Sequence, residues 1–63
     1  MPSSTVTFAH SIGDAVAFVE ARDIRARVQA VKIEFHGELY RVAWWQDGRR
    51  MEDWVYGWEI AAA

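Results

Sequence analysis

The residue types that most often carry catalysis are few in this chain, and little in the sequence would hold them in place. The serines are Ser3, Ser4 and Ser11, all near the N-terminus, and the histidines are His10 and His36. A serine nucleophile needs a histidine base that a third group orients rigidly, and neither histidine has such a setting. We therefore expect no catalytic residues and no enzymatic activity.

Carboxylates and histidines also fail to form a ligand set or a proton-transfer pair. Glu52 and Asp53 are adjacent in a predicted strand, so they point to opposite faces and cannot share a proton. Glu34, His36 and Glu38 alternate along the chain, but a predicted turn at His36 breaks their common face. The absence of cysteine excludes a thiolate metal cluster. We expect neither a metal site nor a cofactor.

Length and composition indicate one small domain that is stabilised by apolar burial. The chain has 63 residues, of which 52% are hydrophobic, and it includes four tryptophans. A chain this short buries only about 60% of the surface that its unfolded form exposes. Burial between the subunits of a homo-oligomer is a common further source of stability for such scaffolds.

The sequence carries no sign of a membrane or export segment. No apolar run approaches the roughly 20 residues that span a bilayer, and Met1 to Ser4 include no basic region of the signal-peptide type. Together with the lack of cysteine, this predicts a cytoplasmic protein with no membrane partner. The predicted organisation is a flexible segment or edge strand over 1–11, a barrel domain over 12–60 and a tail over 61–63, with Thr5 to Phe8 as the edge strand.

Turn dipeptides divide the chain into short segments rich in β-branched and aromatic residues, which is typical of a small barrel or sandwich. Asp47–Gly48 favours a type I′ hairpin, because both central residues of that turn need positive φ. The same register directs Asp53 to the inner face. The predicted cross-strand pairs are Trp45 with Arg50, Ala43 with Glu52, Arg41 with Trp54, Trp44 with Met51, and Tyr40 with Val55.

A second turn is predicted at His36–Gly37, where it would pair Ile33 with Tyr40 and Val31 with Val42. Both turns place the same residues on one face, and such agreement between two registers is expected of a real meander. We take this face as the core. Its predicted members are Val31, Ile33, Tyr40, Val42, Trp44, Met51 and Val55.

The upstream half of the sequence also has the alternation of a strand. Apolar residues alternate from Ile24 to Ala30, and the parity then switches at Val31, which indicates a β-bulge near this point. Ala15 to Glu20 is predicted as the first core strand. The alternative is an α+β fold with a helix over about 14–30 packed on the meander, because several apolar residues there also approximate helical spacing. Period-two alternation favours the all-β fold.

The turns and core positions together form a family pattern. They are Ile12-Gly13-Asp14-Ala15-Val16, Arg27-Val28 with Val31, Tyr40-Arg41-Val42-Ala43-Trp44, Asp47-Gly48, and Val55 with Ile60. From Ile12 to Ile60 the chain resembles a Src-homology-3-like or Tudor-like small barrel, and it also resembles short uncharacterised proteins of bacteria and their phages. The resemblance implies an all-β, five-stranded barrel, and it indicates fold better than function. A Tudor-like barrel implies an aromatic cage for a methylated side chain, but the loop from Glu20 to Asp23, where one wall would lie, has no aromatic residue.

The outer face of the predicted meander is the candidate interaction surface. Small monomers seldom leave so much aromatic area exposed, and tryptophan, tyrosine and arginine are enriched in interface hot spots. We expect cation–π pairs of Trp54 with Arg41 and of Trp45 with Arg50, and we expect Trp58 to close the barrel end. The sequence thus predicts a non-enzymatic module that binds a protein partner or its own copy. The predicted surface consists of Leu39, Arg41, Trp45, Arg50, Trp54 and Tyr56.

Two other functions remain open at this point. Arg22, Arg25 and Arg27 form a basic stripe on the predicted second strand, and an aromatic–arginine face can stack single-stranded bases. The net charge of −2 disfavours nucleic acid as a partner of the whole molecule. The second alternative is an enzyme whose pocket forms between subunits.

Overall fold

The computed structural model describes residues 8–63, and within this range the chain is all-β apart from one short 3-10 turn. Strands occupy the segment from Ala15 to Glu34, so the alternative fold with a helix over about 14–30 is wrong. The predicted edge strand over Thr5 to Phe8 lies outside the described residues except for Phe8, which is in no strand. The elements are β1 (Ala15–Phe18), β2 (Ala21–Glu34), β3 (Gly37–Gln46), β4 (Arg49–Tyr56), the 3-10 turn η1 (Gly57–Glu59) and β5 (Ile60–Ala62).

The five strands form one antiparallel sheet in the order β4-β3-β2-β1-β5. This confirms the five-stranded all-β prediction. The outer strands β4 and β5 are not paired with each other among residues 8–63, so the sheet is open and the predicted barrel closure is not seen. β5 pairs with β1, and the Ala63 N–H donates to the Ala15 carbonyl at 3.1 Å. The residues expected to form a C-terminal tail, 61–63, therefore belong to this side of the sheet.

The hairpin between β3 and β4 has the predicted turn and register. Asp47 has φ 52° and Gly48 has φ 75°, as a turn with two left-handed central residues requires. Trp45 lies opposite Arg50, and Arg41 lies opposite Trp54. The Asp-Gly dipeptide thus determines the pairing of this hairpin locally.

The hairpin between β2 and β3 is displaced from the predicted register by two residues. Its turn consists of Phe35 and His36, and Val31 rather than Ile33 pairs with Tyr40. The predicted turn would have required positive φ at His36, whereas in the structure the positive φ, 126°, falls on Gly37, where no Cβ opposes it. Because the shift is an even number of residues, every side chain keeps its predicted face.

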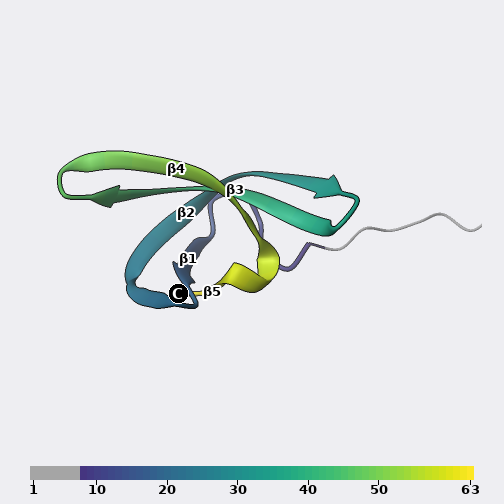
Figure 1. The fold of residues 1–63 in the computed structure, drawn as a ribbon, viewed down its shortest axis with the longest axis horizontal. Helices are drawn as coiled ribbons and strands as arrows, with labels where there is room; N and C mark the ends of the chain where they lie inside the picture. The colour runs from purple at the N-terminus through teal and green to yellow at the C-terminus, as the bar shows by residue number, and fades with distance from the viewer. Residues whose placement is uncertain (1–7) are drawn as a thin grey trace, which may run out of the picture.

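A β-bulge bends β2 at Gln29. Val28 pairs with Val42 and Ala30 pairs with Arg41, so Gln29 is the extra residue, next to the predicted position. Figure 1 shows the consequence, since the two halves of β2 diverge and the two hairpins of the meander project in opposite directions from the bend. The first half of β2 pairs with β1 and its second half pairs with β3, so the bend lies close to the point where these two pairings meet.

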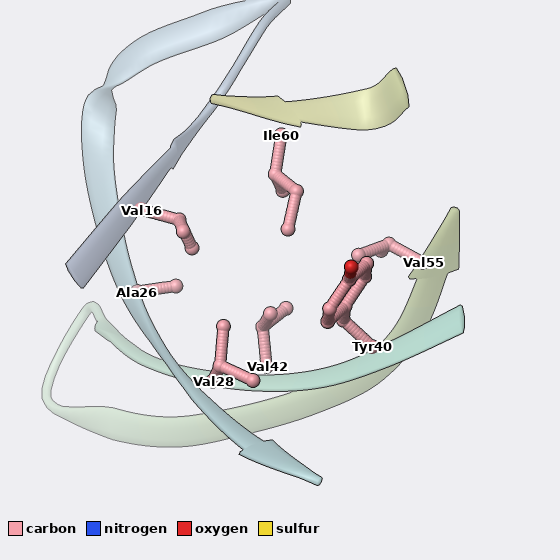
Figure 2. Close-up of a cluster of buried hydrophobic side chains, with 7 residues drawn as sticks. All are labelled: Val16, Ala26, Val28, Tyr40, Val42, Val55 and Ile60. Carbon is pink, nitrogen blue, oxygen red and sulfur yellow. The ribbon is translucent and has the colours of Figure 1, made fainter. Parts of the chain in front are cut away.

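The core lies on the concave side of the bent sheet, and every strand contributes to it (Figure 2). Phe18 and Trp44 pack at its margin in an edge-to-face contact with their ring centroids 5.0 Å apart. The remaining large side chains at the margin are Phe8 and Val31. The buried cluster consists of Val16, Ala26, Val28, Tyr40, Val42, Val55 and Ile60.

The predicted core was too large at the ends of the two hairpins. Ile33 is 54% exposed and Met51 is 39% exposed, although both lie on the inner face. The ends of both hairpins project away from the remaining strands (Figure 1), so no second layer from residues 8–63 covers these side chains. Asp53 is exposed as well, and its Oδ1 accepts the Trp54 N–H at 2.8 Å instead of entering the core.

The buried Tyr40 side chain on β3 has a hydroxyl that is hydrogen-bonded to two half-buried residues. The Tyr40 hydroxyl donates to Glu38 Oε2 at 2.7 Å and accepts the His10 N–H at 3.3 Å. The Tyr40 ring also meets Phe8 and His10 edge-on. Burial, with the Glu38 hydrogen bond as the next cause, raises the pKa of Tyr40 above its ordinary value.

Candidate interaction surface

The six residues of the predicted surface lie on the face opposite the core. Their strand neighbours Tyr40, Val42 and Val55 are buried, and alternate residues of a strand point to opposite sides. The register aligns them in cross-strand pairs, with Trp45 and Arg50 nearest the turn. We call this set the aromatic–arginine face: Leu39, Arg41, Trp45, Arg50, Trp54 and Tyr56.

Trp54 is partly covered by two cations. Lys32 Nζ lies 4.3 Å from the centre of its ring, and the Arg41 guanidinium carbon lies 5.9 Å from it. The contact with Arg41 was predicted, and Lys32 reaches the same ring from β2, across β3. Trp54 is 37% exposed, about half the exposed fraction of Trp45.

Trp45 lacks such a cover. The cation–π contact predicted between Trp45 and Arg50 does not form, because Arg50 Nη1 instead lies 2.8 Å from Glu52 Oε2. This hydrogen bond is the main cause that lowers the pKa of Glu52 from its ordinary value. The Trp45 side chain is left 72% exposed.

Trp58 belongs to the exposed aromatic surface, which the sequence analysis did not anticipate. It is 76% exposed rather than packed against a barrel end, and its ring stacks on Tyr56 with a centroid distance of 5.7 Å and an interplanar angle of 7°. The turn η1 makes this possible, and Glu59 Oε2 accepts the Tyr56 N–H at its start. The only sequence signal for this stack was that Tyr56 and Trp58 flank Gly57.

A groove joins the aromatic–arginine face to the basic stripe of β2. It has a volume of about 530 Å³, and Arg25 and Arg27 line it together with Trp45 and Arg50. Arg27 lies opposite Ala43 in the pairing of β2 with β3. The Arg27 guanidinium is held in place because Nη1 donates to the Gly13 carbonyl at 2.9 Å. We call this hollow the arginine groove, lined among others by Ala15, Arg25, Arg27, Ala43, Trp45 and Arg50.

The third residue of the predicted basic stripe lies elsewhere. Arg22 is not among the residues that line the arginine groove, and it lines a smaller hollow with Arg25 beside Ala61, Ala62 and Ala63. Sequence alternation placed all three arginines on one strand. It could not indicate which other strands each arginine would lie beside. Arg25 thus lines both hollows, Arg27 lines only the arginine groove, and Arg22 lines only the smaller hollow.

Other classes of site were sought in the part of the chain that the structure describes. Residues 8–63 bring together no three His, Cys, Asp or Glu side chains that could hold a metal ion. Among the same residues there is no helix with the length and apolarity needed to cross a bilayer. No protein-family model matches the chain, and neither the curated proteins nor the solved structures contain a significant match to it. Its function must therefore be inferred from its own residues and their geometry.

Proposed function

We propose that this chain is a non-enzymatic interaction module that binds a protein surface, either a second copy or a different chain, through the aromatic–arginine face together with Trp58. The observation that carries the proposal is the exposure of Trp45 and Trp58, at 72% and 76%. Exposed apolar surface of this kind on a small soluble protein often marks a protein–protein interaction site. The proposal requires no cofactor, and a cytoplasmic location remains a prediction from the sequence.

The arrangement of the face supports this function. Trp54 lies near its middle under the charged groups of Lys32 and Arg41, so part of the surface is already ordered before a partner binds. Trp45 lies toward the hairpin turn, and Trp58 lies beyond the other end of β4. Rigid aromatic anchors beside arginine are the residue types that contribute most to binding in protein interfaces.

The oligomeric state tests whether the chain binds a second copy of itself. We expect sedimentation velocity to show concentration-dependent association of the wild-type chain, with Trp45→Ala and Trp58→Ala each weakening it by about tenfold or more, as for hot-spot residues. Phe35→Ala is the matched control, because Phe35 is 96% exposed on a hairpin turn outside the face. Equal effects of all three variants would contradict a specific surface.

If the chain stays monomeric, the proposal requires that the face binds a different protein. A photoreactive residue at position 45 should then cross-link one defined protein from the native host, and an excess of unlabelled wild-type chain should suppress that product. The same group at position 35 serves as the control. A monomer whose position 45 gives no product beyond that of position 35 would rule the proposal out.

We further propose that the open sheet curls into the small barrel that the resemblance implies. The bend at Gln29 and the inward side chains from all five strands support this. An experimental structure in which solvent fills the space between β4 and β5 would contradict it.

A further inference from the structure

We infer that the arginine groove binds single-stranded nucleic acid, with phosphates on the arginines and one base stacked on Trp45. This inference goes beyond the proposed protein contact, and it involves β2 residues that the proposed contact does not use. It begins from the shape of the groove. Ala15 and Ala43 are small, and they leave a hollow of about 530 Å³ between the longer side chains.

The charge of the groove favours an anionic occupant. Arg25, Arg27 and Arg50 line it, and no carboxylate is among its lining residues. Glu52 offsets part of the charge of Arg50 from outside the lining, at 2.8 Å. The chain as a whole carries a net charge of −2, so the groove is a local exception to an acidic molecule. Guanidinium groups at fixed positions along a groove match the spaced phosphates of an extended chain.

The aromatic component separates nucleic acid from an acidic peptide. A peptide carboxylate would satisfy the arginines, but it would not cover the exposed Trp45 indole. An unpaired base has a π face that can stack on that ring. Trp54 differs in this respect, because Lys32 already lies over its ring, whereas no cation from the described residues lies over Trp45. A duplex keeps its bases stacked on each other, so it cannot use Trp45 in this way.

Fluorescence anisotropy with a labelled single-stranded oligothymidylate tests the inference on the full chain. We expect binding at low salt that weakens as salt is added, with a log–log slope of about −2 for three phosphate contacts. Arg25→Gln should weaken binding and reduce the slope by about 0.7. Trp45→Ala should weaken binding by about fivefold or more and leave the slope unchanged. Circular dichroism establishes that each variant is folded.

Matched controls distinguish the groove from a general charge effect. Arg49→Gln removes one positive charge from the β3–β4 hairpin, on the face opposite Trp45 and Arg50. Arg22→Gln removes one positive charge from β2 at a residue that does not line the groove. Both should bind oligothymidylate like the wild-type chain. An effect of Arg49→Gln equal to that of Arg25→Gln would overturn the inference, and so would the absence of binding at low salt.

Two competitors test the class of ligand. Polyglutamate that displaces the oligonucleotide as effectively as unlabelled oligothymidylate would show that the groove takes acidic peptides, and duplex DNA that binds equally well would exclude base stacking. Either result overturns the inference. The two proposals can fail independently of each other. Trp58→Ala should weaken only the protein contact, whereas Arg25→Gln should weaken only the binding of nucleic acid. Weak competition by both polyglutamate and duplex DNA supports the inference.

Discussion

Lys32 Nζ lies 4.3 Å from the centre of the Trp54 indole, although the two residues belong to strands that are separated by β3. The lysine stem crosses the outer face of β3, and the Arg41 guanidinium approaches the same ring, at 5.9 Å. Trp54 is therefore part of a three-strand contact that orders the middle of the aromatic–arginine face. Trp45 lies four pairs nearer the turn, and no cation from residues 8–63 covers it in the same way.

The Lys32–Trp54 contact should be measurable as a coupling energy. Lys32→Met keeps an apolar stem over the ring but removes the charge, so we expect it to cost about 0.5–1 kcal/mol of unfolding free energy in urea. In a Trp54→Leu background the same substitution should cost nearly nothing, because the π system is gone. Equal costs in both backgrounds would show that the charge does not interact with the indole.

The two tryptophans of the face should differ in their contribution to folding. Trp54→Ala removes a ring that is largely covered, and we expect a loss of about 1.5–3 kcal/mol. Trp45→Ala removes a ring that is 72% exposed, and we expect a change within about 0.5 kcal/mol. Thermal and urea unfolding measure both. A large loss for Trp45→Ala would mean that this side chain has a structural role and is unsuitable as a binding probe.

Replacement of Gly48 tests the local origin of the β3–β4 register. Gly48 has φ 75°, and open space surrounds the position where a Cβ would be placed. We therefore expect Gly48→Ala to cost about 1–2 kcal/mol through backbone strain alone. Asparagine tolerates this region better, so Gly48→Asn should cost less. If both variants are equally destabilised in urea, backbone strain is not the cause.

Stability should fall at alkaline pH because of Tyr40. Its pKa is raised in the folded state, so the native chain keeps the hydroxyl proton at a pH where the unfolded chain has lost it. This contribution is complete below the ordinary tyrosine value of 10.0 and is lost as the pH rises through the folded-state pKa. The unfolding free energy, measured in urea at a series of pH values, should therefore decline above about pH 10.

Tyr40→Phe is the variant that checks the cause of this decline. It should remove most of the alkaline slope and cost about 1.5–3 kcal/mol near neutral pH, because the hydrogen bond to the Glu38 carboxylate is lost. Tyr56→Phe serves as the control and should keep the slope. An unchanged slope in Tyr40→Phe would assign the alkaline instability to another group.

The open edge of β4 is protected by carboxylates. Trp54 and Tyr56 are two residues apart, so their N–H groups point to the same side of β4, and each donates to a side-chain oxygen, of Asp53 and Glu59 respectively. Occupied edge donors cannot pair with another strand. We expect Asp53→Ala to increase aggregation by light scattering, whereas Glu52→Ala, an equal change in charge without an edge contact, should not. Equal scattering from both would contradict this role.

Much of the sheet could be predicted because its determinants are local. Asp47 and Gly48 determined their hairpin correctly, since few residue pairs accept two positive φ values in succession. The other turn was placed one residue late, because Gly37 can serve either as a central turn residue or as the residue that follows the turn. The displacement was even, so the face of each side chain was still correct.

The sequence by itself determined which side chains share a face, because strand alternation and turn chemistry depend on neighbours along the chain. Only the tertiary structure decided which of them meet. The register on the N-terminal side of the bulge at Gln29 sets Arg27 opposite Ala43, so Arg25 and Arg27 line the same hollow as Trp45. The projection of the hairpins leaves Ile33 and Met51 exposed. Curvature and the limits of the core arise from packing among all five strands at once, and no local pattern specifies contacts between residues so far apart in the chain.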